Sequence, residues 1–369
     1  MISFIFDFMA LISIYLILTL SLNLDAGYCG IPDFGKVLPM AGGAFTVSLF
    51  AGRIATALLG IEGDFINDNS YVVAQINSKI GNNPLLCFVS LLTTLIVAMG
   101  FGAALGYLFT RPAIKRGVGP LALLTLAAGE AIRIIGYNYN PLAGGSVGVS
   151  APDVFVWGGR YRFAIASIIL LVVGLLVFFY VNRLTNSPLG RTLRAIRDDE
   201  DAACSLGIDT TKIRLKTIMI SSSITSLAGA LYAFYSGAVI SSAYTRASWS
   251  FVPWAMMLLG GMANNLGVTV GVLSLISIRE LIIIFKHPLS PFIPFDILWF
   301  ELIIYGIAII LILLYRPQGI LREKPTPTLK IQTIEKMHDT FLNTSNSVNY
   351  KANKSKDLGY CRLHKLRKL

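Results

Sequence analysis

Long apolar stretches separated by short polar loops dominate the hydrophobic pattern of this 369-residue chain. A membrane-spanning helix needs about 20 mostly apolar residues. By this measure the predicted crossings are 2–24, 36–60, 84–110, 118–136, 162–182, 213–236 and 298–315. A further apolar stretch, 251–285, is too long for one helix. It is interrupted by Gly260, Gly261 and Gly267, which predicts two short segments hinged at that point.

Composition agrees with a chain that lies mostly in a bilayer. Hydrophobic residues make up 54% of it, charged residues only 14%, and the mean hydropathy is +0.67. These values exclude a water-soluble globule, a fibrous protein and disorder over most of the length. We therefore predict an all-α polytopic membrane protein, a bundle of nine or ten transmembrane helices that includes a broken, Gly-rich helix pair. The first apolar run carries Asp7 and lacks a basic start, so we interpret it as a retained helix.

The basic loops predict which ends face the cytoplasm, because short loops rich in Lys and Arg stay on that side. Loops 110–117 and 183–216 and the C-terminal tail are basic, and an even number of crossings separates them if 251–285 crosses twice. The acidic loop 61–83 and the Gly-rich loop 137–161, with Gly144 and Gly145, then lie outside. Nine crossings would put the N-terminus outside, whereas a tenth within 25–60 would put it inside.

The basic excess belongs mainly to the tail. From Arg316 to Leu369 there are twelve Lys and Arg residues against four Asp and Glu. We predict a transmembrane domain over 1–321 and a disordered cytoplasmic tail over 322–369, in a multi-pass protein of the cell membrane. Attraction to anionic headgroups of the lipid bilayer is the simplest role for the tail. Without a folded recognition motif, nucleic-acid binding is not expected.

The sequence contains no motif for catalysis. There is no Gly-x-x-x-x-Gly-Lys-Ser/Thr phosphate loop, no metalloprotease motif, and no paired-cysteine metal spacing among the four cysteines. The three histidines are dispersed. We expect a non-enzymatic chain that has no ATPase site of its own and binds neither a cofactor nor a metal.

The cytoplasmic loop at about 187–212 is the most informative segment. Ser187 and Pro188 suit a helix start, and Leu189, Leu193 and Ile196 share one face of the predicted helix. Its arginines lie elsewhere around the helix. A second short helix begins at the acidic run 198–201 and ends at Gly207. Two interpretations remain open: a folded protrusion that seats on a soluble partner, or a basic loop that only sets topology. The arginines are Arg191, Arg194 and Arg197.

The same residues resemble a known family. Asp201-Ala202-Ala203, followed after three residues by Gly207, is similar to the Glu-Ala-Ala-x-x-x-Gly signature of ABC importer permeases, with Asp in place of Glu. The run Gly190-Arg191-x-Leu-Arg-Ala-Ile-Arg197 is similar to the cytoplasmic loop of permeases that import branched-chain amino acids. The likeness covers about residues 15–321 and is closest to the LivM-type half of a LivH/LivM pair. Further resembling segments are 121–133, Gly144-Gly145-Ser146-x-Gly148, 227–232, Leu259-Gly260-Gly261 with Gly267, and Arg316-Pro317-x-Gly319.

The resemblance implies the ABC importer permease fold and a set of partners. These are a second homologous permease subunit, cytoplasmic ATPase subunits that bind ATP and Mg, and an extracytoplasmic substrate-binding protein. The implied coupling residues are Arg191, Arg194, Arg197, Asp201, Ala202, Ala203 and Gly207. Two segments depart from the family: Asp33 and Lys36 replace the usual Ser and His of the first Gly-rich segment, and Asn264-Asn265 stands where small residues are common.

Charged and glycine residues within the crossings are candidates for the translocation path or a gate. Glu130 and Arg133 are three residues apart on one predicted helix and can pair. They either lie near the path or mark a short helix whose arginine reaches the outer interface. Glycines in such helices pack closely against neighbours, and a broken helix also places backbone polar groups at membrane depth. The glycine candidates are Gly144, Gly145, Gly260, Gly261 and Gly267.

Two other functions remain to be compared with import of branched-chain amino acids. The same machinery can import urea, a sugar or a nucleoside, because related permeases do so. An ATP-independent secondary transporter or channel is a further alternative, but it leaves the 187–212 loop without a purpose.

Overall fold

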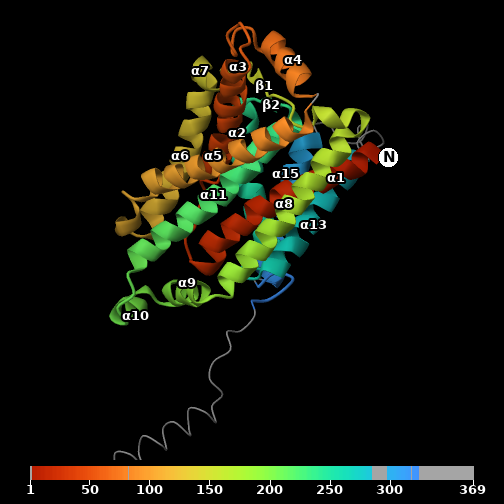
Figure 1. Cartoon of the computed structure of the whole chain (residues 1–369). Helices are drawn as coiled ribbons and strands as arrows, with labels where there is room; N and C mark the ends of the chain where they lie inside the picture. Colours follow the sequence, from red (N-terminus) through yellow and green to blue (C-terminus); the bar gives the residue numbers. More distant parts are fainter. Residues whose placement is uncertain (1, 82, 285–296, 317, 324–369) are drawn as a thin grey trace, which may run out of the picture. The chain divides into compact units, whose positions relative to one another are not determined.

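The computed structural model describes residues 2–81, 83–284, 297–316 and 318–323 (Figure 1). The chain up to Glu323 forms one compact unit. Apart from Arg322 and Glu323, the predicted tail at 322–369 lies outside the described residues, so its disorder and its contact with lipid stay predictions.

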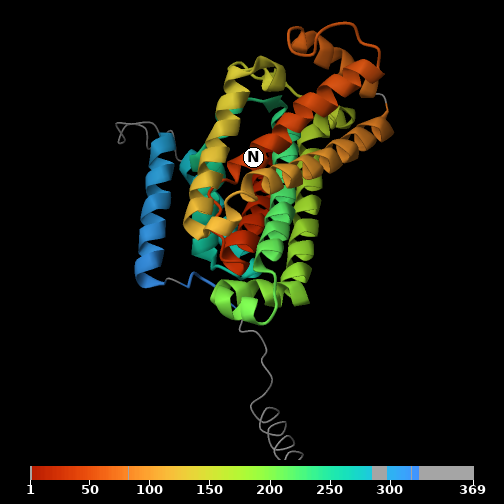
Figure 2. The ribbon, with the colours of Figure 1, turned by 90° about the vertical axis from the view of Figure 1, so that its left-hand side faces the viewer.

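In the described part of the chain, helical segments pass nine times between the two ends of the bundle (Figures 1 and 2). Seven of these passes are long and apolar enough to cross a membrane. The other two are α12, which is short, and α15, whose described apolar run is Ile303–Ile312. The passes are α1 (Ile2–Leu22), α2 (Val37–Thr46) continued by η2 (Val47–Ile54) and α3 (Ala55–Leu58), α5 (Pro84–Thr110), α6 (Val118–Asn138), α8 (Arg162–Thr185), α11 (Thr210–Ser236), α12 (Val252–Gly260), α13 (Asn265–Ile284) and α15 (Ile297–Tyr315).

Shorter elements cover the two ends. The helices α9 (Pro188–Asp198) and α10 (Glu200–Ser205) lie across one end, called the α9 end below, together with η3 (Ile114–Arg116) (Figure 1). The opposite end carries α4 (Asn69–Ile80), α7 (Asn140–Ala143), η4 (Val156–Tyr161), η5 (Ser241–Ala243) and the strands β1 (Val149–Ser150) and β2 (Ala238–Val239). The two strands pair antiparallel, with Val149 opposite Val239.

The loops predicted to share a side lie at the same end. Loops 110–117 and 183–216 and the segment after α15 are all at the α9 end, whereas 61–83 and 137–161 are at the opposite end (Figures 1 and 2). The chain enters α1 at that opposite end. Among the described residues the count of passes is therefore nine, and no tenth lies within 25–60.

Helices α2 and α11 form the centre of the bundle. In each, 78% of the apolar window is buried, against 28–33% for α5, α6 and α8. Small residues allow this close packing: a Cβ on Gly229 of α11 would lie 1.9 Å from the Met40 carbonyl oxygen of α2. Ser226 of α11 donates a hydrogen bond to the Ala98 carbonyl of α5. Backbones that approach this closely are typical of helix packing in membranes.

The structure corrects the prediction for 251–285. The stretch is broken as expected, at a turn where Gly261 has φ +113° and Ala263 has φ +57°. Only α12 is short, however, since α13 has 20 residues and is long enough to span alone. The sequence suggested two short segments because the glycines continue to Gly267 and Gly271, which in fact lie inside α13 and pack against α12.

Packing at Gly229 gives a direct stability test. We expect Gly229→Ala to lower the free energy of unfolding by about 1–3 kcal/mol, because the new methyl group meets rigid backbone. The matched control is Gly100→Ala in α5, where nothing lies within 4 Å of the added Cβ. Thermal unfolding of the detergent-purified protein measures both, and equal stability of the two variants would contradict the packing account.

Candidate functional site

Helix α9 is held against the bundle by one apolar face. Leu193 and Ile196 are buried and Leu189 is half-buried, which confirms the predicted face. Pro188 occupies the first turn as expected, but the Ser187 hydroxyl donates to the Leu184 carbonyl and does not cap the helix. Gly190 lets α9 approach α8, since a Cβ there would lie 2.0 Å from the Thr185 carbonyl oxygen.

Two of the three predicted coupling arginines turn inward. Arg197 Nη1 donates to the Gly27 carbonyl at 2.8 Å, and its Nη2 lies 3.0 Å from Glu323 Oε2. Arg194 Nε lies 3.2 Å from Glu323 Oε1, with its guanidinium 5.0 Å from the ring centroid of Tyr28. Burial by itself would lower the pKa of Arg197, but its hydrogen bonds and ion pairs with Glu323 and Asp198 together outweigh that effect and raise the pKa. These arginines therefore fasten α9, and only Arg191 is exposed.

Helix α10 is a short, capped turn that projects beyond α9. Asp199 Oδ1 accepts from the Ala202 amide at 3.0 Å, so this carboxylate caps the helix. Glu200 Oε1 accepts from Arg214 of α11 at 2.7 Å, and Ala203 is buried beneath the turn. Gly207 ends it at φ +81°, as its position predicted. Apart from Ala203, every residue from Asp201 to Gly207 is exposed, and Leu206 is 81% exposed.

A buried amide network joins three elements beside this attachment. Helix α1 continues into the π-helical segment η1 (Asn23–Tyr28). Asn23 Nδ2 donates to Asn265 Oδ1 at 3.0 Å, and Asn23 Oδ1 accepts from the Ala263 amide at 2.9 Å. Asn265 Nδ2 in turn donates to Thr185 Oγ1 at 3.0 Å. The end of α1, the α12–α13 turn and the end of α8 are thus tied to one another directly above α9.

A buried ion cluster lies in the same irregular part of the chain. Lys36 Nζ is 2.6 Å from Asp25 Oδ2, 3.3 Å from Asp33 Oδ2 and 3.1 Å from Ser221 Oγ. Sequence reasoning noted Asp33 and Lys36 only as departures and did not select Asp25. The available signal was an Asp and a Lys flanking a break between two apolar stretches, since charges at membrane depth are normally paired.

The predicted path residues Glu130 and Arg133 do form a pair. Arg133 Nε donates to Glu130 Oε1 at 2.9 Å, and both groups keep some exposure. A third member, which sequence reasoning missed, is Arg246, whose Nε lies 2.9 Å from Glu130 Oε2. Arg246 has helical backbone angles and immediately precedes η6 (Ala247–Phe251), the π-helical start of α12.

The glycine candidates lie apart from this triad. Gly144 and Gly145 form a turn with positive φ at the end opposite α9, against Gly148 and Asn140. Gly260 and Gly267 bring α12 and α13 into backbone contact: a Cβ on Gly260 would lie 2.1 Å from the Gly267 carbonyl oxygen. Close packing explains these glycines, and a role as a gate stays a prediction.

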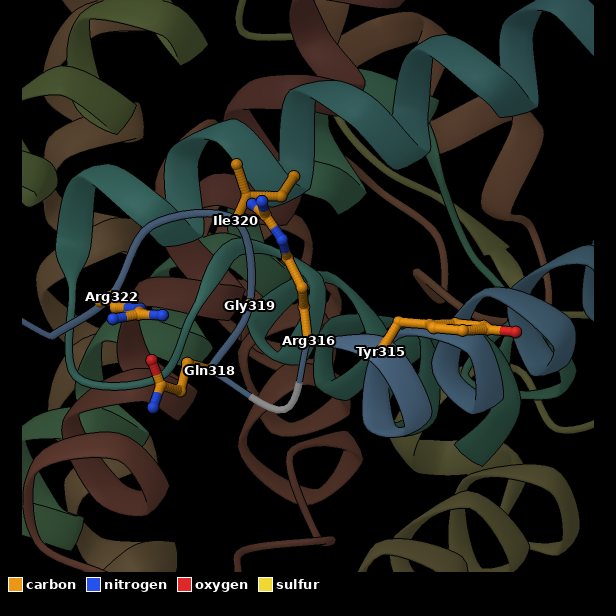
Figure 3. Close-up of a pocket in the computed structure, with 6 residues that line it drawn as sticks. All are labelled: Tyr315, Arg316, Gln318, Gly319, Ile320 and Arg322. Atoms are coloured by element: carbon orange, nitrogen blue, oxygen red, sulfur yellow. The ribbon is translucent and has the colours of Figure 1, made fainter.

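The turn at Gly261 is covered by the chain that follows α15. The Ile320 and Leu321 amides donate to the Leu259 and Gly260 carbonyls at 2.9 and 3.0 Å. Beside this contact lies a partly open pocket of about 470 Å³ (Figure 3). It is lined by Tyr315, Arg316, Gln318, Gly319, Ile320 and Arg322. Among the residues that the structure describes, no group of His, Cys, Asp and Glu is arranged to hold a metal ion.

Comparison with known proteins gives a consistent result. Residues 4–313 match the family model described as "Branched-chain amino acid transport system / permease component". The chain is 38% identical over 328 residues to the "Probable branched-chain amino acid transport permease protein LivM" of Methanocaldococcus jannaschii, covering 87% of this chain and 95% of the relative. It is 28% identical to the "High-affinity branched-chain amino acid transport system permease protein LivM" of Salmonella typhimurium and of Escherichia coli, covering 89% and 88% of this chain and 72% of each relative. No solved structure matches.

The buried ion cluster predicts a large asymmetry between single and combined substitutions. We expect Lys36→Met to destabilise the protein by about 3–5 kcal/mol, because it leaves buried carboxylates without their counter-ion. Adding Asp25→Asn and Asp33→Asn to that variant should restore much of the loss. The control Lys212→Ala removes the solvent-exposed pair with Asp209 and should change the stability far less. Chemical unfolding in detergent measures all three, and a single-variant cost no larger than the control would refute the cluster's role.

Proposed function

The chain belongs to the family of permease components of branched-chain amino acid transport systems, and we propose that it is the membrane-spanning permease of an ATP-driven importer of branched-chain amino acids. It works with a second homologous permease subunit, cytoplasmic ATPase subunits and an extracytoplasmic binding protein. ATP and Mg bind to the ATPase subunits. The chain supplies one wall of the translocation path and receives force from outside itself.

The observation that carries the proposal is the attached α9–α10 segment. It lies at the end of the bundle that carries the basic loops, which the positive-inside rule assigns to the cytoplasm, along with the start of the tail. Its outer surface is small, exposed and centred on Leu206. Its inner surface is fixed by apolar burial and by Glu323. A segment attached on one face and free on the other suits docking in a groove of an ATPase subunit.

The attachments also provide a route for the force. When the ATPase subunits close and pull on α10, α9 moves as a unit with α8 through the Gly190–Thr185 contact. The bond from Arg197 to the Gly27 carbonyl carries the displacement to the end of α1. Asn265 links the same end to α13. Two rigid arrangements of these helices would then open the path to one side of the membrane or the other.

Transport by the reconstituted complex tests the cargo. Liposomes containing this chain, its second permease subunit and the ATPase subunits should accumulate leucine when the binding protein and ATP are present. Urea and ribose, offered with the same components, should not be taken up. Uptake of urea or ribose in preference to leucine would overturn the proposed cargo but not the assignment as an ATP-driven importer. Uptake without ATP would overturn that assignment.

Substitutions in α10 test the docking surface. We expect Gly207→Val combined with Ala203→Glu to abolish co-purification of the ATPase subunits, because one change strains a left-handed residue and the other places a charge beneath the turn. Membrane insertion should be unaffected. The matched control is Gly60→Val, an equally left-handed glycine with an equally open surrounding at the opposite end. Normal ATPase association in the double variant would remove the coupling assignment.

A further inference from the structure

Glu130 and Arg246, which form a triad with Arg133, lie well inside the membrane-spanning region. Glu130 is twelve residues from the start of α6 and eight from its end. At 1.5 Å per residue it is about 18 Å from one end of the helix and about 12 Å from the other. Arg246 is bonded to Glu130 and therefore lies at the same depth. Both are far from the headgroup levels that long side chains can reach from a helix end.

The triad is not enclosed by this chain. The Arg246 side chain is 43% exposed, Arg133 31% and Glu130 23%. A charged side chain at the bilayer centre costs several kcal/mol in contact with hydrocarbon. This face therefore looks into an aqueous path or toward a second subunit, and not into lipid.

Aromatic side chains adjoin the charges. Phe34 stacks on Trp254 at 4.9 Å between ring centroids and lies 6.3 Å from Phe251. Trp254 Nε1 donates to the Asp33 carbonyl at 3.0 Å, which fixes the group in place. Phe251 is 47% exposed and follows Arg246 by about one turn of the π-helical segment.

The charged triad and the aromatic group adjoin where α6 packs against the chain before α2. A Cβ on Gly129, the residue before Glu130, would lie 3.7 Å from the Gly35 Cα, and Gly35 follows Phe34. One face of the chain thus presents a carboxylate, two guanidinium groups and an apolar aromatic surface side by side. Its charges sum to +1.

We propose that this face, formed by Glu130, Arg133, Arg246, Phe34, Phe251 and Trp254, is the substrate-contacting wall of the path for a zwitterionic amino acid with an apolar side chain. The inference rests on the proposed function and adds the residues that recognise the cargo. The α-carboxylate binds Arg246, the α-ammonium binds Glu130, and the branched side chain lies on the aromatic rings. When an amino acid binds, its two charged groups replace the ion pair between Glu130 and Arg246. The net gain in binding free energy is therefore small, so the amino acid binds weakly and can move on along the path. The second permease subunit completes the site.

If Arg246 binds the α-carboxylate, a substitution of Arg246 should remove the preference for ligands that carry a carboxylate. Weak binding of leucine and of leucinamide, which lacks the carboxylate, is measured by saturation-transfer NMR on the permease pair in nanodiscs. Wild type should prefer leucine by about tenfold or more, the value of one charge-assisted hydrogen bond. Arg246→Gln should reduce the preference to less than about twofold, and Arg246→Lys should retain part of it. A preference unchanged by Arg246→Gln would overturn the assignment.

Uptake by the complete complex separates recognition from structure. Glu130→Gln and Arg246→Gln should lower leucine uptake by about tenfold while the ATPase subunits remain bound and hydrolyse ATP. The control Arg53→Gln changes an arginine that bonds the Pro141 carbonyl away from this face and should transport normally. Loss of the second permease subunit from the variant complexes would mean that the face is a subunit interface and would overturn the inference. Failure of the wild-type complex to import leucine would instead overturn the proposed function.

Discussion

The requirement that polar groups find partners inside the membrane decides how this bundle is built. The chain departs from regular α-helix around 23–36 and again at 240–251 and 261–264, on either side of α12, and each departure leaves backbone and side-chain groups that lipid cannot satisfy. Lys36 between Asp25 and Asp33 holds the first break, and Asn23 links that break to the second. Without these buried contacts neither break would have a fixed geometry. Everything attached to them, including α9, would lose its position.

The placement of α9 makes the first break more than a structural detail. Arg197 bonds the Gly27 carbonyl within the break, and Gly190 rests on the end of α8. The most exposed part of the α9 end is therefore fastened to the part of the bundle where helices are least regular. Helical interiors resist bending, whereas breaks held by a few polar contacts have alternative arrangements of similar energy. Under the proposed coupling, force applied at α10 would reach the irregular segments, which are the positions that can respond to it.

Much of the fold followed from hydrophobic periodicity and loop charge alone. The crossings, the placement of the basic loops at one end and the two helices of the 187–207 segment were all predictable, because each depends on local sequence. The inward turn of Arg194 and Arg197 was not, since their partners, Glu323 and Gly27, are more than a hundred residues away. Arg246 was missed for the same reason: its pairing with Glu130 joins two distant segments. Local pattern identifies a charge in the membrane but does not reveal which segment supplies its partner.

The account depends on α10 facing the cytosol, and Cys204 offers a natural probe of that position. Among the described cysteines it is exposed, whereas Cys29 and Cys87 are buried. In a chain with Cys361→Ser, a membrane-impermeant maleimide should label Cys204 in inside-out vesicles and leave it unlabelled in intact cells. Labelling of Cys204 in intact cells would place α9 and α10 outside, where no ATPase can reach them, and would contradict the central claim.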